Sequence, residues 1–205
     1  MDLNFGEIID QESRALQWKW REGTTKPNEI NRLIVIEGIN AKKIIETYVA
    51  KNIQPLCTSK SMQIYNIDND VLCVAEEQDL NYYSSMTKFI EEFQIVSKDV
   101  ILVSLQSLSE FKNDSKPENC LIRGINSKFN DIPALSSPNF ISGVAAGVAS
   151  NSIMHEKKFA CYIIYVDIYD EESIKFILNH LQRVNLPFDD TVKIRALHHK
   201  SDLYM

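Results

Sequence analysis

Three runs of apolar, largely β-branched residues constrain the fold of this 205-residue chain more than any other feature. They are RLIVIEG at 32–38, DVILVSLQ at 99–106 and KFACYIIYVD at 158–167. Strands that are apolar on both faces have to be covered on both faces, as the strands of parallel sheets are. Helical patterns separate the runs. The sequence therefore predicts an α/β fold, with a mostly parallel or mixed sheet flanked by helices.

Amphipathic or small-residue periodicity predicts four helices, within residues 40–52, 81–94, 138–154 and 170–184. Asn40 is placed to cap the first helix, and Pro138 to begin the third. Gly143 and Gly147 lie four residues apart on one face of the third helix, which lets it pack closely against the sheet. Two further strands, SMQIYNI and DVLCVAEE, are expected to form a hairpin at 68–70, and CLIRGI another strand.

These elements predict one main folded unit with an extension at each end. Residues 1–31 are expected to form an amino-terminal arm laid over the domain. Residues 32–188 form the α/β domain, and residues 189–205 a carboxyl-terminal tail, in which only Thr191 to Leu197 has a regular pattern.

Composition excludes several classes of partner. A net charge of −6 and a pI near 5.3 argue against nucleic acid or an anionic membrane as the main partner. The first fourteen residues lack the apolar core of a secretory signal, and no apolar run approaches the ~20 residues of a membrane span.

The cysteines lie too far apart for a zinc site or a redox pair, and reduced, buried thiols are expected at Cys57, Cys73, Cys120 and Cys161. A cytoplasmic or nuclear protein is predicted.

The motifs of catalysis and cofactor binding are missing from the sequence. The GVAAGVAS segment lacks the spacing of a phosphate-binding loop, and Ser142 and Ser152 lack a nucleophile elbow. The adjacent His198 and His199 point different ways and read as a solvated tail. The other two histidines have no His or Cys partner at helical spacing; they are His155 and His180. No metal, cofactor or enzyme is predicted, although catalytic groups can also converge from distant positions.

The last three residues, Leu203, Tyr204 and Met205, form a hydrophobic-tyrosine-X ending. The aliphatic and aromatic side chains fit an apolar pocket, and a terminal carboxylate fits a lysine or backbone N–H groups. Burying each side chain contributes about 1.5–3 kcal/mol, against an association cost of roughly 4–15 kcal/mol. The tail alone therefore binds weakly, and a docked body has to share the binding.

Three places resemble the proteasome assembly chaperone 1 family. Phe5-Gly6-Glu7 is similar to the opening of that family. The stretch 126–170 is similar to its proline-asparagine helix and following strand, at Pro138, Asn139, Ala145 and Tyr162. Leu203-Tyr204-Met205 matches its terminal motif. The likeness is clearest over residues 119–205.

The resemblance implies a non-enzymatic chaperone with a three-layer fold like that of nucleoside phosphorylases. It implies pairing with a proteasome assembly chaperone 2 homologue and binding to the outer face of the 20S α-ring. Leu203, Tyr204 and Met205 would enter a pocket between α subunits and block premature activator docking. Phe5, Gly6 and Glu7 would contact the ring near its centre. The long acidic amino-terminal extension of larger members has no counterpart in this sequence, so its role does not carry over.

Two alternatives stay open at this point. A small-molecule enzyme of nucleoside-phosphorylase type would need His, Arg and Glu or Asp converging at the strand ends. A generic adaptor would pack its tail on itself. The helix of Gly143 and Gly147 and the aromatic residues of the amino-terminal arm are candidate contact surfaces.

Overall fold

Four parallel strands occupy the centre of an eight-stranded mixed sheet, and antiparallel strands extend it on both sides. The computed structural model describes residues 16–76, 80–112 and 119–197. The strand order is β1-β3-β4-β5-β2-β6-β8-β7. The strands are β1 (Lys19–Trp20), β2 (Ile30–Gly38), β3 (Cys57–Thr58), β4 (Met62–Ile67), β5 (Asp70–Ala75), β6 (Ser97–Gln106), β7 (Cys120–Ile125) and β8 (Phe159–Val166).

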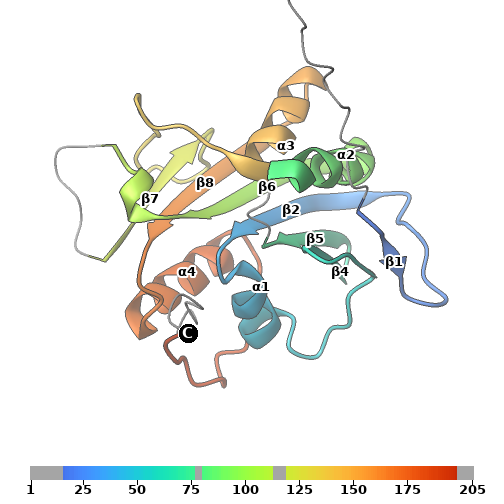
Figure 1. Ribbon diagram of the computed structural model, residues 1–205, viewed down its shortest axis with the longest axis horizontal. Coiled ribbons are helices and arrows are strands. Elements are labelled where there is room, and N and C mark those ends of the chain that lie inside the picture. Colours follow the sequence, from blue (N-terminus) through green and yellow to red (C-terminus); the bar gives the residue numbers. More distant parts are fainter. Residues whose placement is uncertain (1–15, 77–79, 113–118, 198–205) are drawn as a thin grey trace, which may run out of the picture.

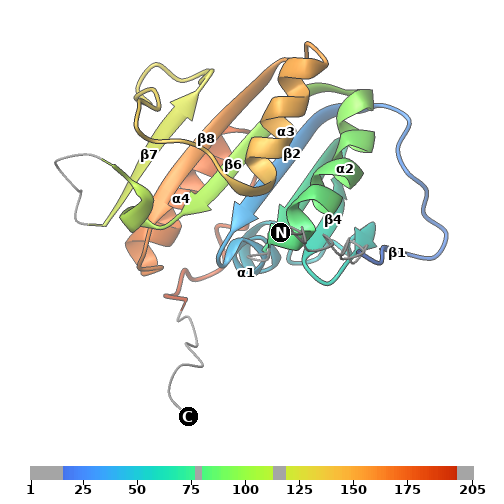
Figure 2. The ribbon, with the colours of Figure 1, turned by 45° about the horizontal axis from the view of Figure 1, so that its top comes forward.

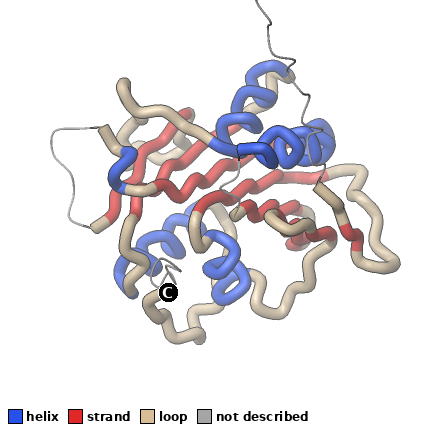
Figure 3. Tube along the Cα trace, viewed as in Figure 1, coloured by secondary structure: helices blue, strands red, loops and turns tan. Residues whose placement is uncertain are grey.

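Two layers of helices cover the sheet (Figures 1 and 3). One face carries α2 (Leu80–Val96) and α3 (Gly143–Met154). The other carries α1 (Ala41–Ile44), the π-helix η1 that continues it (Ile45–Val49) and α4 (Glu171–Arg183). A short 3₁₀-helix, η2 (Leu108–Glu110), follows β6. Among these helices, none is long and apolar enough to cross a membrane.

Strand β2 shows why the central runs are apolar throughout. Leu33 and Val35 pack into the core beneath α2 and α3, whereas Ile34 and Ile36 pack into the core beneath α1 and α4. Alternate residues of a strand face opposite sides, so a strand covered on both sides is apolar at successive positions along its centre. The predicted α/β fold, with its mixed sheet between helices, is confirmed.

Asn40 stands where the sequence predicts a helix cap, but its side chain makes no capping hydrogen bond. Its backbone is left-handed, with φ at 64°, and its carbonyl accepts the N–H of Ile44 at 2.9 Å. Asn tolerates this conformation, which turns the chain sharply from β2 into α1. The predicted side-chain cap is therefore wrong, and the residue serves the turn instead.

Helix α3 begins at Gly143 after Ser142, five residues later than the predicted start at Pro138. The side chain of Asn139 holds the intervening segment as a loop. Its Oδ1 accepts the N–H of Lys112 at 2.7 Å, and its Nδ2 donates to the Lys112 carbonyl at 3.2 Å. These contacts with the segment after η2 hold Asn139 in a loop that precedes the helix.

Gly147 faces helix α2, not the sheet as the sequence predicts. A Cβ at this position would lie 2.5 Å from Thr87 Oγ1 and 2.7 Å from Thr87 Cγ2. The small residue is thus needed for the close approach of α2 and α3. Gly143 does approach the sheet, where its missing side chain leaves room for the Glu37 carboxylate.

Gly147→Ala is expected to destabilise the fold by overpacking the contact with Thr87, a cost of about 1–3 kcal/mol. The better helix propensity of Ala offsets about 1 kcal/mol of this loss. In a Thr87→Ala background the clash is relieved, so Gly147→Ala should there be neutral or stabilising. Urea unfolding of the four proteins of this cycle measures the coupling. Equal effects of Gly147→Ala in both backgrounds would contradict the proposed close contact.

Candidate functional site

The carboxyl ends of the central strands lie along one edge of the sheet, which we call the carboxyl edge. Strands β5, β2, β6 and β8 run parallel and end there at Ala75, Gly38, Gln106 and Val166. The arrowheads of β2 and β6 lie on the same side of the molecule in Figure 2, close to the start of α1. This is the edge at which open α/β sheets usually bind ligands.

A buried carboxylate, Glu37, closes the amino terminus of α3 at this edge. Its Oε2 accepts the backbone N–H groups of Val144 at 2.7 Å and Ala145 at 3.1 Å. Its Oε1 accepts the hydroxyl of Ser104 at 2.9 Å, which ties β2 to β6. The N–H groups and the dipole of a helix amino terminus favour a negative group at this position.

This arrangement determines what else the carboxyl edge can bind. In many α/β proteins a ligand phosphate occupies the free amino terminus of such a helix. Here the protein's own carboxyl group takes that place, and the N–H groups of Val144 and Ala145 that would hold a phosphate already donate to Glu37. Glu37 is not among the residues predicted from the sequence to form a site. The signal for it was an acidic residue at the end of an apolar strand, followed directly by glycine.

The environment of Glu37 acts on its ionisation in two opposing ways. Burial is the stronger effect and raises the pKa of the carboxyl to about 7. The hydrogen bonds from Ala145, Ser104 and Val144 favour the charged form and lower the pKa, but they do not outweigh burial.

Two pockets flank the chain at the end of β6. One, of about 270 Å³, lies on the α3 side and includes Glu37, Ser104 and Gly143. The other, of about 340 Å³, is lined by both apolar and polar residues, and we call it the edge pocket. It is lined by Ile39, Asn40, Leu105, Gln106, Ser107, Val166, Asp167, Ile168, Tyr169 and Leu197. Among the described residues that line these two pockets there is no His or Arg.

The segment 188–197, which we call the strap, leads to the edge pocket. It crosses the face that carries α1 and α4, and it is neither helix nor strand. The N–H of Asp189 donates to the Tyr48 carbonyl at 2.8 Å, and the N–H of Leu197 donates to the Tyr169 carbonyl at 2.8 Å. The strap residues that pack against the core are Phe188, Val192, Ile194 and Leu197. The strap is thus held at both ends.

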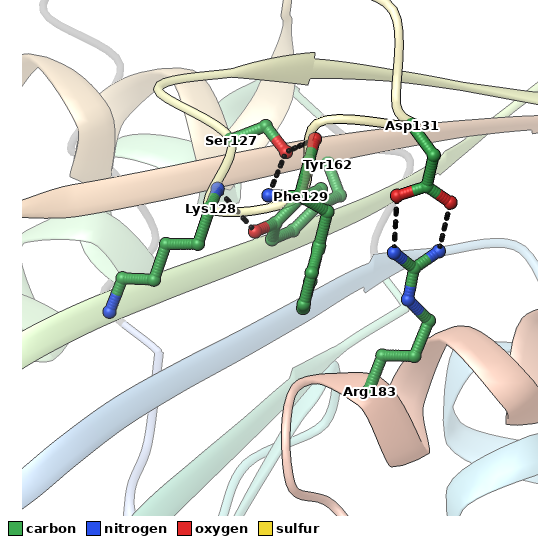
Figure 4. A network of polar contacts seen from close by, with 6 residues as sticks. All are labelled: Ser127, Lys128, Phe129, Asp131, Tyr162 and Arg183. Carbon is green, nitrogen blue, oxygen red and sulfur yellow. Dashed lines mark hydrogen bonds and ion pairs between the residues drawn. The ribbon is translucent and has the colours of Figure 1, made fainter.

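The loop between β7 and α3 is fastened to α4 by a second polar network (Figure 4). Asp131 accepts two hydrogen bonds from the guanidinium of Arg183, at 2.6 and 3.0 Å. That guanidinium lies 4.2 Å from the ring centre of Phe129. The N–H of Lys128 donates to the Tyr162 hydroxyl at 3.3 Å. These contacts are structural and leave no open site.

His180 lies beneath this network, packed against the rings of Tyr162 and Phe129. It is buried, and its Nε2 has no hydrogen-bond partner among the described residues. Burial lowers the pKa of the imidazole to about 4, with a smaller contribution from the charge of Arg183. His155 is exposed and pairs with Glu91 at 2.9 Å. No cluster of potential metal ligands occurs in the described part of the chain.

The residues predicted to form the partner-binding site lie outside the described ranges. They are Leu203, Tyr204, Met205, Phe5, Gly6 and Glu7, and His198 and His199 also lie outside. Of the residues behind the resemblance, Tyr162 is buried in β8 and Ala145 in α3. These two residues support the fold, and the structure does not bring them together into a surface site.

Glu37→Gln should change how stability depends on pH. The carboxyl pKa rises from an ordinary value of 4.5 to about 7 on folding. The contribution of this carboxyl to the free energy of unfolding is therefore full below pH 4.5. Roughly 3 kcal/mol of it is lost as the pH rises to 7. Relative to Glu37→Gln, the wild type should lose stability over this window in urea unfolding. The exposed Glu172→Gln is the control, and parallel profiles of wild type and Glu37→Gln would contradict the assignment.

His180→Leu should change the dependence of stability on pH in the opposite direction. The imidazole pKa falls from an ordinary value of 6.5 to about 4 on folding, so its contribution is present above pH 6.5 and lost as the pH falls to 4. The loss is again roughly 3 kcal/mol. His180→Leu should therefore resist acid better than the wild type, whereas Glu37→Gln should resist it less well. Acid sensitivity unchanged by His180→Leu would disprove the role of this imidazole.

Comparisons with known proteins give the fold. No protein-family model and no curated protein matches this sequence. A protein of unknown function from Thermoplasma acidophilum matches with a TM-score of 0.56 and 14% identity, over 87% of this chain and 81% of that chain.

Two structures from Pyrococcus furiosus are also similar. PbaA, described as an archaeal homolog of proteasome-assembly chaperone, has a TM-score of 0.55 and 11% identity, over 85% of this chain and 88% of that chain. PbaB, described as an archaeal proteasome activator, has a TM-score of 0.56 and 9% identity, over 86% of this chain and 92% of that chain. The chain therefore shares the α/β fold of PbaA and PbaB.

Proposed function

We propose that this chain is a chaperone of 20S proteasome assembly that binds the α-ring. The fold that it shares with PbaA and PbaB over most of its length supports this proposal. The sequence resemblance to assembly chaperones points the same way. The proposal includes a homologous second chaperone as partner and a cytoplasmic or nuclear location.

The chemistry of the carboxyl edge fits a binding protein better than a nucleoside phosphorylase. Glu37 occupies the helix terminus where a phosphate would be held. Recognition of phosphate and nucleoside would need His and Arg. Among the described residues that line the edge pocket and the pocket beside Glu37, neither occurs. Exposed apolar side chains stand at the same edge, among them Ile39 and Ile168. Apolar surface of this kind favours contact with a polypeptide segment over contact with a polar small-molecule substrate.

The strap limits how far the tail can reach. The sequence allows an extended segment from Pro187, but the strap is held against the body as far as Leu197. Eight residues follow, and fully extended they span at most about 28 Å. Leu203, Tyr204 and Met205 are proposed to enter a pocket between α subunits within that distance of the docked body. Body and tail then bind together, which raises the effective concentration of the tail.

Deleting residues 203–205 should weaken co-purification with α-ring intermediates and competition with activators. Tyr204→Ala should reduce affinity by about 10- to 100-fold, because roughly 1.5–3 kcal/mol of burial is lost. Tyr204→Phe keeps the ring and should lose less. Ser201→Ala is the matched control in the same segment. Affinity can be measured by titrating the purified proteins against α-ring intermediates.

Unchanged ring binding after deletion of residues 203–205 would contradict the proposed insertion of the tail between α subunits. Phe5→Ala in the same titration tests the proposed amino-terminal contact, which should make a smaller contribution. Pull-down from cells identifies the second chaperone. Phosphate-dependent cleavage of nucleosides by the purified chain would instead support the enzymatic alternative.

A further inference from the structure

The edge pocket has features of a binding site that the ring-binding proposal does not use. Its volume of about 340 Å³ falls within the range of about 300–1,000 Å³ typical of ligand pockets. Ile39, Leu105 and Val166 give it apolar walls at the ends of β2, β6 and β8. Ile168 stands at its rim with 69% of its surface exposed. An aliphatic or aromatic group entering the pocket would cover these side chains.

One lining residue of the edge pocket, Asn40, holds a buried donor that has no partner among the described residues. Asn40 is only 8% exposed, and its Nδ2 makes no hydrogen bond to any described residue. A buried donor without an acceptor is costly, and few occur in native proteins. An entering tyrosine hydroxyl or backbone carbonyl would supply the acceptor after a small adjustment of the side chain. The edge pocket thus has, within its described lining residues, one unsatisfied donor that a rotation of Asn40 would turn toward an occupant.

The described chain leads directly into this pocket. Leu197, the last residue of the strap, forms part of its wall and is fixed by the hydrogen bond to Tyr169. Residues 198–205 follow, with the sequence HHKSDLYM. Leu203 is six residues beyond Leu197, so it can reach any point within about 20 Å. Ser201 and Asp202 are turn-forming residues that suit a reversal of the chain between the two.

Of the described residues in the pocket wall, the one that is charged complements the first three residues of this segment. Asp167 lies in the pocket wall, where its carboxylate accepts the Ser107 hydroxyl at 2.6 Å and the N–H of Leu108 at 2.9 Å. The segment begins with His198, His199 and Lys200, which are basic or become so on protonation. Docking of these three residues near Asp167 would be favourable, whereas Asp202 and the terminal carboxylate would have to lie away from Asp167.

We propose that the edge pocket binds an aliphatic-tyrosine segment, and that in the free protein its occupant is residues 198–205 of the same chain. Leu203 and Tyr204 fill the apolar part, and Asn40 donates to an acceptor of the segment. The consequence for function rests on the ring-binding proposal. The tail is stored on its own body until the α-ring offers a competing pocket. If storage holds ten molecules in eleven, the apparent affinity for the ring falls about tenfold.

Isoleucine methyl NMR of the full chain tests this docking directly. Tyr204→Ala removes the aromatic ring that is proposed to lie in the pocket. The δ1-methyl signals of Ile39 and Ile168 should therefore shift. The methyl signals of Ile95 and Ile153 should stay unchanged, because these residues are exposed on the carboxyl-terminal ends of α2 and α3. Absence of any shift at Ile39 and Ile168 would overturn the proposal.

Two variants test the pocket itself. Ile168→Asp places a charge at the rim, and Asn40→Gly removes the amide while allowing the positive φ of this turn. A chain ending at Leu197 should bind the peptide HHKSDLYM, and either substitution should weaken that binding several-fold. Ile153→Asp is the matched control, since Ile153 is 67% exposed and lies outside the pocket. Equal peptide binding by the Ile168→Asp and Ile153→Asp chains would count against the pocket.

Ring binding separates this proposal from the proposed function. In the full chain, Ile168→Asp should free the tail and strengthen binding to the α-ring several-fold, whereas Ile153→Asp should not. If deletion of residues 203–205 abolishes ring binding but the methyl signals do not respond to Tyr204→Ala, storage fails and ring binding stands. If the methyl signals respond but the deletion leaves ring binding unchanged, storage of the tail stands and binding of the α-ring through the tail fails.

Discussion

The Glu37 carboxylate holds together three elements that are distant in the sequence. It ends β2, accepts a hydroxyl from β6 and receives two backbone N–H groups of α3. Because α3 starts on this carboxylate, its glycines fall where no side chain would fit, Gly143 against Glu37 and Gly147 against Thr87. The packing of α2 and α3 over the sheet thus depends on one buried acid. The same acid removes the helix terminus from use as a phosphate site.

Burial of Glu37 destabilises its charged form, and burial of His180 does the same for an imidazole on the opposite face of the sheet. The two effects have opposite signs with pH. Glu37 loses stabilisation as the pH rises through its window, whereas His180 gains it over nearly the same window. The pair therefore offset each other between about pH 4.5 and 6.5. A fold can keep two buried ionisable groups in this way and still vary little in stability below neutrality.

The elements that sequence predicts well are those fixed by local pattern. Apolar runs give β2, β6 and β8 because strands buried on both faces require apolar residues at successive positions along their centres. The roles of Pro138 and Gly147 differ from those predicted because they depend on groups far along the chain, whereas the role of Asn40 depends on its left-handed backbone. The start of α3 follows from Glu37, more than a hundred residues earlier, and the position of Gly147 from Thr87 in α2. Periodicity within one helix carries no information on such partners.

The strap limits the distance over which the tail can reach a pocket. A long free tail would search a large volume, and its effective concentration near any one pocket would be low. Anchoring at Tyr48 and Tyr169 leaves eight residues beyond Leu197, which confines the search to the neighbourhood of the carboxyl edge. Any pocket that captures Tyr204 must then lie close to the body, whether it belongs to a partner or to the chain itself. The chain's own pocket begins at Leu197, whereas a partner's pocket comes within reach only after docking, so the partner's pocket must bind the tail more tightly to take it over.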